Sequence, residues 1–198
     1  MRSAFGVLQA NGRYLAAAFA VFLLGWVLGA VFTEELQSLL QASLDKLEGL
    51  ADKIGEDAGP WRISELIFLN NLQAALAMLL FGIPLCFPTV FMLLSNGMVV
   101  GAVVNSTGAG TSFWETMLFG LLPHGIFELP ALFIAAAFGL KLGKVLIVPL
   151  PDKTRLQSFG FVWKEILKVS WLVVLLLVVA AGVEGTITPV LLDTFVVK

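Results

Sequence analysis

Charged residues, cysteine and histidine are all scarce in this chain of 198 residues. Only 13% of its residues are charged, compared with about 25% in a typical soluble domain, whereas 59% are hydrophobic. This composition excludes an ordinary soluble protein and indicates an integral membrane protein. A formal net charge of -2, with no dense basic stretch, gives no reason to expect nucleic acid as a partner.

The single cysteine and the single histidine restrict the chemistry further. Cys86 has no second cysteine with which to form a disulfide, a CxxC redox pair or a zinc site. No HExxH sequence surrounds His124, and one histidine with two glutamates is a poor set of metal ligands. Ser95 and His124 make a poor intramembrane protease pair, because "LSNG" lacks the context of a nucleophile. We therefore expect no catalytic residue, no metal and no cofactor, and predict that the protein is not an enzyme.

Five apolar runs are long enough to cross a bilayer, whose hydrocarbon core needs about 20 helical residues. They lie near 14–33, 64–82, 86–105, 124–142 and 166–185. The first run is too long for a signal peptide and is not followed by a cleavage site, so we interpret it as a retained anchor. The sequence thus predicts an all-α polytopic membrane protein, with one membrane domain over 1–198 and its termini on opposite sides of the lipid bilayer.

The positions of lysine and arginine predict the orientation of these spans, because cytoplasmic connections are enriched in both residues. Half of the twelve basic residues lie in the connection between the fourth and fifth runs or at its two ends: Lys141, Lys144, Lys153, Arg155, Lys164 and Lys168. The segment from Glu34 to Pro60, in contrast, carries seven acidic residues and two lysines. We predict a multi-pass protein of the cytoplasmic (cell) membrane, with its N-terminus in the cytoplasm and its C-terminus outside.

The outward segment has the periodicity of an amphipathic helix over residues 34–58, with leucines recurring every three or four positions. Its apolar face needs a partner, which can be the outer surface of the same chain, a second copy, a different protein or lipid. Its acidic polar face argues against anionic lipid. Gly97 and Gly101 form a GxxxG pair, which lets a helix approach closely, either within the chain or in a dimer. We predict a homodimer.

The fourth apolar run is interrupted by proline. Residues 113–140 would form a helix of about 42 Å at about 1.5 Å per residue, longer than the hydrocarbon core of about 30 Å. Proline suits the first turn of a helix and disrupts its interior, so we predict a break at Pro123 and a span that begins at His124. Pro130, further along, leaves the carbonyl of Ile126 without its usual donor.

Six polar residues lie at similar depths on four of the predicted spans: Asn70, Asn71, Asn96, His124, Glu128 and Glu184. Ionisable side chains inside a span are costly unless they are paired or hydrated, and they normally face the bundle interior. We expect these residues to form one polar cluster in the outer half of the membrane. Two interpretations remain: a structural clasp held by hydrogen bonds, or a site for a proton, an ion or a polar ligand.

Four short motifs resemble the stage II sporulation protein M family of polytopic membrane proteins. They are "PHGIFELPA" at 123–131, "NN" at 70–71 with a glycine at 82, "SNGMVVG" at 95–101 and "VEGTITP" at 183–189. The resemblance implies a similar number of spans and an outward helical segment after the first, and it lends no catalytic residues. The family's namesake is a membrane scaffold that holds peptidoglycan-remodelling enzymes in sporulating bacteria. The residues at the family's characteristic positions are Asn70, Asn96, His124, Gly125, Glu128 and Glu184.

The sequence leaves two functions open. The first is a non-enzymatic homodimeric scaffold that recruits a partner membrane or cell-envelope protein through its outer helix or its basic inner loop. The second is a transporter or channel that uses the outer polar cluster for a proton, an ion or a small polar solute, since transporters point broken helices at their binding sites. No inverted repeat is evident in the 198 residues, which favours the scaffold.

Overall fold

The computed structural model describes residues 3–34, 41, 59–83, 86–106 and 116–195. Every regular element in these ranges is a helix: α1 (Ala4–Ala10), α2 (Gly12–Val31), α4 (Pro60–Leu80), α5 (Phe87–Ser106), η1 (Thr116–Leu121), α7 (Leu122–Ile147) and α8 (Arg155–Phe195). Five of them, α2, α4, α5, α7 and α8, are long and apolar enough to cross a membrane. The all-α fold predicted from the sequence is confirmed. The predicted outer helix at 34–58 lies outside the described residues, except for Glu34 and Gln41.

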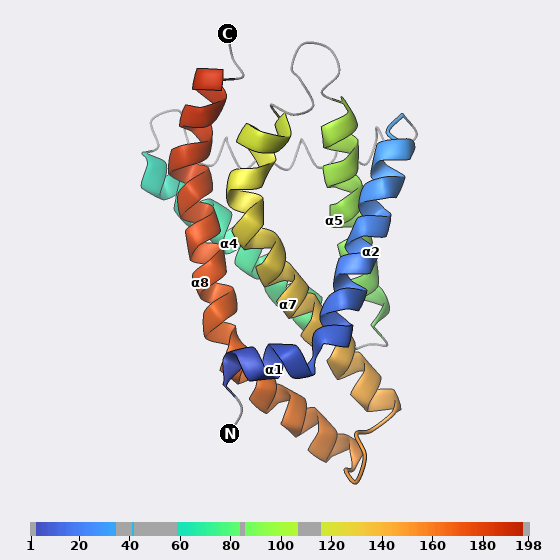
Figure 1. Ribbon diagram of the computed structural model, residues 1–198. Helices are drawn as coiled ribbons and strands as arrows, with labels where there is room; N and C mark the ends of the chain where they lie inside the picture. The colour runs from blue at the N-terminus through green and yellow to red at the C-terminus, as the bar shows by residue number, and fades with distance from the viewer. Residues whose placement is uncertain (1–2, 35–40, 42–58, 84–85, 107–115, 196–198) are drawn as a thin grey trace.

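Helix α7 lies at the centre of the bundle (Figure 1). Of its membrane-crossing part 72% is buried inside the protein, against 22–33% for the other four spans. Helices α8 and α4 pack against it on one side and the α2–α5 pair on the other. Small buried residues on α7, such as Ala131, Ala135 and Ala136, let these neighbours approach closely. The other spans expose large apolar side chains, as a lipid-facing surface requires.

Two glycine motifs join α2 to α5. A Cβ added at Gly25 or Gly29 of α2 would lie 2.3 or 2.0 Å from a carbonyl oxygen of α5. A Cβ added at Gly97 or Gly101 of α5 would lie 2.2 or 2.0 Å from a carbonyl oxygen of α2. The GxxxG pair noted in the sequence is therefore packed against a second GxxxG of the same chain, which we did not predict. These four glycines do not supply a dimer contact.

A change of helix type precedes the fourth span. The segment η1 is a π-helix that passes directly into α7, whose first turn contains Pro123. Proline fits there because the first N–H groups of a helix have no acceptor within it. The break predicted at Pro123 is thus a switch from π-helix to α-helix, and the α-helix begins at Leu122 rather than at His124.

Helix α8 is much longer than the predicted fifth span. Its 41 residues extend about 61 Å, roughly twice the hydrocarbon core. The range of 166–185 is predicted from the apolar run alone. The charged residues Arg155, Lys164 and Glu165 precede this run, but the helix continues through them. The beginning of α8 and the end of α7 form a hairpin at one end of the bundle, and α1 lies across this end (Figure 1).

Candidate functional site

The outer cluster, as we name Asn70, Asn71, Glu128 and Glu184, joins three helices toward the end of the bundle that we predict to face outward. Asn71 of α4 donates a side-chain hydrogen bond to the carboxylate of Glu128 on α7. The carboxylate of Glu184 on α8 lies close enough to Glu128 to interact with it electrostatically. Nδ2 of Asn70 donates to Oδ1 of Asn71 at 3.3 Å. Polar groups from three spans therefore meet around Glu128.

Close contact between α8 and α4 brings Glu184 to this cluster. A Cβ added at Gly185 would lie 2.2 Å from Oγ of Ser64 and 3.0 Å from the carbonyl oxygen of Pro60, so a small residue is needed there. Ser64 and Asn71 are two helical turns apart on α4, and both are buried on the same face. The approach at Gly185 therefore holds Glu184 near the face of α4 that carries Asn71.

The other residues singled out in the sequence differ from these four. Asn96 is exposed on α5, and its Nδ2 donates to the carbonyl oxygen of Met92 on the same helix at 2.8 Å. The side chain of His124 lies outside the described part of the structure. Gly125 is buried, although a Cβ there would meet no described heavy atom within 4 Å. Pro130 is exposed and lines a shallow apolar hollow between α1, α2 and α7. The outer cluster thus gathers Asn70, Asn71, Glu128 and Glu184 but not Asn96, and the structure does not describe the side chain of His124.

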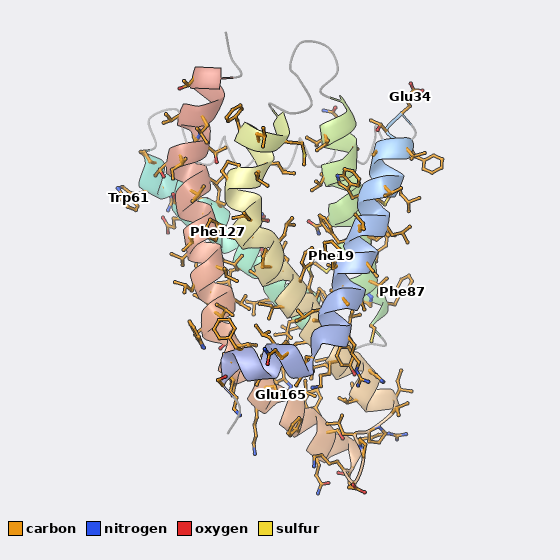
Figure 2. All side chains as sticks on the ribbon, viewed as in Figure 1. Phe19, Glu34, Trp61, Phe87, Phe127 and Glu165 are labelled. Atoms are coloured by element: carbon orange, nitrogen blue, oxygen red, sulfur yellow. The ribbon has the colours of Figure 1, made fainter. Side chains whose placement is uncertain are left out.

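A second polar cluster lies toward the opposite end of α7, and we did not predict it from the sequence. This inner network consists of Asn11, Lys141 and Glu165, which are only 2%, 6% and 6% exposed. Lys141 of α7 forms an ion pair with Glu165 of α8, and its Nζ donates to Oδ1 of Asn11 at 2.6 Å. Nδ2 of Asn11 donates to the carbonyl oxygen of Val7 at 2.8 Å and to Oε1 of Glu165 at 3.5 Å. Glu165 lies beside α1, so the network ties three parts of the chain together (Figure 2).

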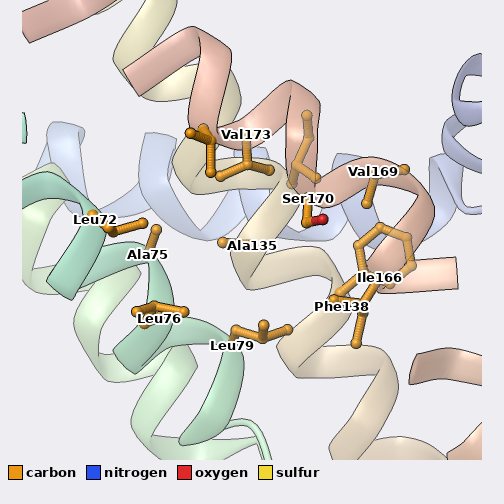
Figure 3. Close-up of a pocket in the computed structure, with 12 residues that line it drawn as sticks. Leu72, Ala75, Leu76, Leu79, Ala135, Phe138, Ile166, Val169, Ser170 and Val173 are labelled. Carbon is orange, nitrogen blue, oxygen red and sulfur yellow. The ribbon is translucent and has the colours of Figure 1, made fainter. Parts of the chain in front are cut away.

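An apolar layer separates the two clusters along α4, α7 and α8. It surrounds a hollow of about 90 Å³, shown in Figure 3. Ser170 is the only polar residue among the twelve that line the hollow, and its hydroxyl donates to the carbonyl oxygen of Leu167 on its own helix at 3.2 Å. The side chains lining this hollow therefore offer no polar route between the outer cluster and the inner network.

The charges distinguish the outer cluster from the inner network. Two carboxylates repel each other when both are ionised, and the repulsion is strong where water is scarce. A proton or a small cation held between Glu128 and Glu184 would remove this repulsion. Within the described ranges, no group of three or more His, Cys, Asp or Glu side chains gathers in a way that could hold a metal ion. The outer cluster therefore brings two acidic side chains from different helices within electrostatic range of each other.

The chain's only cysteine is half-buried. Cys86 has a positive φ of 66° in the connection between α4 and α5, and its Sγ donates to the carbonyl oxygen of Leu140 at 3.3 Å. Burial raises the pKa of the Cys86 thiol, partly offset by a backbone hydrogen bond to Lys144. A raised thiol pKa lowers the thiolate fraction at neutral pH.

Five apolar helices with polar clusters between them define a polytopic integral membrane protein. Residues 18–189 match the family described as Stage II sporulation protein M, and the chain belongs to this family. Two relatives from Methanocaldococcus jannaschii are both described as uncharacterized proteins. MJ0793 is 33% identical over 123 residues, which cover 62% of this chain and 69% of the relative. MJ0706 is 31% identical over 125 residues, which cover 62% of this chain and 54% of the relative. No solved structure shows a significant match to the chain.

Proposed function

We propose that the outer cluster binds a proton or a small cation, and that this membrane protein is a non-enzymatic transporter or channel for it. The observation that supports the proposal is the meeting of Glu128 and Glu184, from two different spans, beside one donating amide. Acidic side chains inside a span are costly, and they typically mark ion paths or proton relays. A purely structural clasp needs no like charges, since amides or opposite charges provide hydrogen bonds without repulsion.

The apolar layer supports a gated path rather than an open one. Along α4, α7 and α8, the side chains that line the hollow beneath the cluster are apolar except for Ser170. An ion bound at Glu128 would have no polar partner along this hollow. Release toward the inner network would require the three helices to shift relative to one another, as in hinge or shear motions.

Flux measurements on reconstituted protein test the proposal. The purified protein is placed in liposomes, and the entry of protons, Na⁺ and K⁺ is recorded under an imposed gradient. We expect Glu128→Gln and Glu184→Gln each to abolish flux, because the amide keeps hydrogen bonding but removes the charge. Glu65→Gln is the matched control, because Glu65 is an exposed acid on α4 that pairs with Arg62 at 2.7 Å.

Two results would contradict the proposal. The first is a wild-type protein that passes none of these ions. The second is flux that persists in both glutamine variants or that is lost equally in the Glu65→Gln control.

The scaffold function, the homodimer and the partner protein stay predictions. The segment 34–58, one of the two surfaces through which a scaffold could recruit a partner, is described only at Glu34 and Gln41. The glycines of the GxxxG pair are occupied by α2 of the same chain. We rank ion transport first because two acidic side chains of different spans interact between the helices, a feature that a scaffold does not need.

The orientation in the cytoplasmic membrane also stays a prediction, and cysteine labelling tests it. Single cysteines are introduced at Asp52 or Lys153, and intact cells are treated with a thiol reagent that does not cross the membrane. We expect Asp52→Cys to react and Lys153→Cys to react only after the cells are opened, because basic connections stay in the cytoplasm. The reverse pattern would invert the assignment of the outer cluster and the inner network.

A further inference from the structure

A basic hollow lies on the hairpin between α7 and α8. Its volume is about 500 Å³, and it is lined by Asp152, Lys153, Gln157, Gly160, Phe161 and Lys164. Lys153 and Lys164 are both exposed. Nζ of Lys153 lies 5.8 Å from the centre of the Phe161 ring, and Nζ of the buried Lys141 lies 5.7 Å from the same point. The hollow therefore combines two accessible ammonium groups with an aromatic ring.

Hydrogen bonds fix the turn that forms one side of this hollow. The backbone N–H of Thr154 donates to Oε1 of Gln157 at 3.0 Å, and the N–H of Gln157 donates to Oγ1 of Thr154 at 3.3 Å, which makes a capping box. The buried hydroxyl of Ser158 accepts from the N–H of Leu150 at 2.9 Å and donates to the carbonyl oxygen of Thr154 at 2.9 Å. These bonds hold Lys153 beside the first turns of α8, so the hollow is built into the fold.

Neighbouring side chains on α8 place the hollow at the depth of lipid headgroups. Trp171 is exposed, and exposed tryptophans are typical of the membrane–water interface. Lys164 precedes Trp171 by seven residues, which is about 10 Å along the helix. Leu156 and Leu167 are also exposed on this part of the helix, where they can contact acyl chains.

The charge of the hairpin favours an anionic occupant. Six basic residues and two acidic ones lie between Lys141 and Lys168. One of the acids, Glu165, is already paired with Lys141 inside the protein. The other acid, Asp152, lines the hollow, where its carboxylate can accept hydrogen bonds from hydroxyl groups.

We propose that this hollow binds the headgroup of an anionic phospholipid. Lys153 and Lys164 contact its phosphate, because ammonium groups bind phosphate oxygens through charge-assisted hydrogen bonds. Asp152 accepts from the hydroxyl groups of a headgroup such as glycerol. The site is independent of the ion proposed for the outer cluster.

Selective retention of lipid by the full-length protein tests this site. The protein is equilibrated in micelles containing equal amounts of phosphatidylglycerol and phosphatidylcholine, and the bound lipids are identified by native mass spectrometry. We expect the wild type to retain phosphatidylglycerol selectively, and Lys153→Gln/Lys164→Gln to lower this selectivity several-fold. Lys144→Gln/Arg155→Gln is the matched control, because it removes the same charge from exposed positions of the hairpin that do not line the hollow. Thermal unfolding in phosphatidylcholine alone checks that all variants are folded.

The outcomes separate a defined site from general attraction. The headgroup site is supported if only the Lys153 and Lys164 variant loses selective retention of phosphatidylglycerol, and if added glycerol phosphate does not displace the lipid from the wild type. An equal loss in both double variants would show diffuse attraction to the hairpin and would overturn it. If soluble glycerol phosphate displaces the lipid at a concentration similar to that of the phosphatidylglycerol, the ligand is a free phosphate compound, and the headgroup site would also be overturned.

Discussion

The inner network and the outer cluster lie on the same two helices, α7 and α8, but they combine charges in opposite ways. In the inner network Lys141 and Glu165 neutralise each other, and Asn11 completes their hydrogen bonds. In the outer cluster Glu128 and Glu184 are both acidic and would repel each other if both were ionised, and Asn71 donates to Glu128. Opposite charges explain the inner network as an anchor without any ligand. Like charges within a membrane cost energy, which is why we assign a ligand to the outer cluster.

The inner network also explains how the short helix α1 is held in place. A helix of seven residues is not stable by itself, because its few hydrogen bonds do not offset the cost of nucleation. Val7 of α1 packs in a core cluster with residues of α7 and α8, including Phe138 and Val162. Asn11, at the junction of α1 and α2, bonds to both charges of the ion pair. Packing and polar contacts thus fix α1 across the ends of α7 and α8.

Breaking the inner ion pair should have the largest effect on stability. Lys141→Met leaves Glu165 buried without its counter-charge, so we expect the free energy of unfolding to fall by about 3–5 kcal/mol. Lys141→Met/Glu165→Met removes both charges and should recover most of this loss, because well-packed apolar residues replace a buried ion pair at little cost. Unfolding by sodium dodecyl sulfate in mixed micelles measures both values.

Two comparisons sharpen this test of the inner network. Asn11→Ala should cost less, about 1.5–3 kcal/mol, because it removes hydrogen bonds to charged groups but leaves the ion pair intact. A double methionine variant that is as unstable as Lys141→Met would contradict an anchor that depends on charge balance.

The five spans and the outer acids could be predicted from the sequence, since both are local signals. Apolar runs of membrane length stand out in hydropathy, and a carboxylate such as Glu128 stands out because it interrupts one of them. The position of Pro123 likewise identifies the start of the fourth span to within two residues. What the sequence does not contain is the pairing between spans, which brings Glu128 to Asn71 but leaves Asn96 on its own helix.

The inner network escaped prediction because each of its members has an ordinary explanation in the sequence. Lys141 and Glu165 lie among the basic residues of a connection that we predict to be cytoplasmic, so the positive-inside rule accounts for Lys141 without any contact. Asn11 precedes the first apolar run and resembles a helix cap. Only the length of α8, which runs as one helix from Arg155, brings Glu165 against the end of α7. This continuity could not be seen in the sequence, because a hydropathy profile places the start of the fifth span after the charged residues.

A double-mutant cycle on the outer cluster should give a smaller effect of the opposite sign, which tests the comparison most directly. When no proton or cation is bound, Glu128→Gln and Glu184→Gln should each leave the protein as stable as the wild type or more stable, because either substitution removes the repulsion between the carboxylates. The double variant should then gain less than the sum of the two single gains, by about 1 kcal/mol, since the repulsion can be removed only once. The same unfolding assay measures all four proteins, in a buffer of fixed pH and salt. In the inner network the second substitution rescues the first, whereas in the outer cluster it adds little to the first. Additivity of the two glutamine substitutions within about 0.3–0.5 kcal/mol would show that the carboxylates do not interact, and the shared ion site would have to be abandoned.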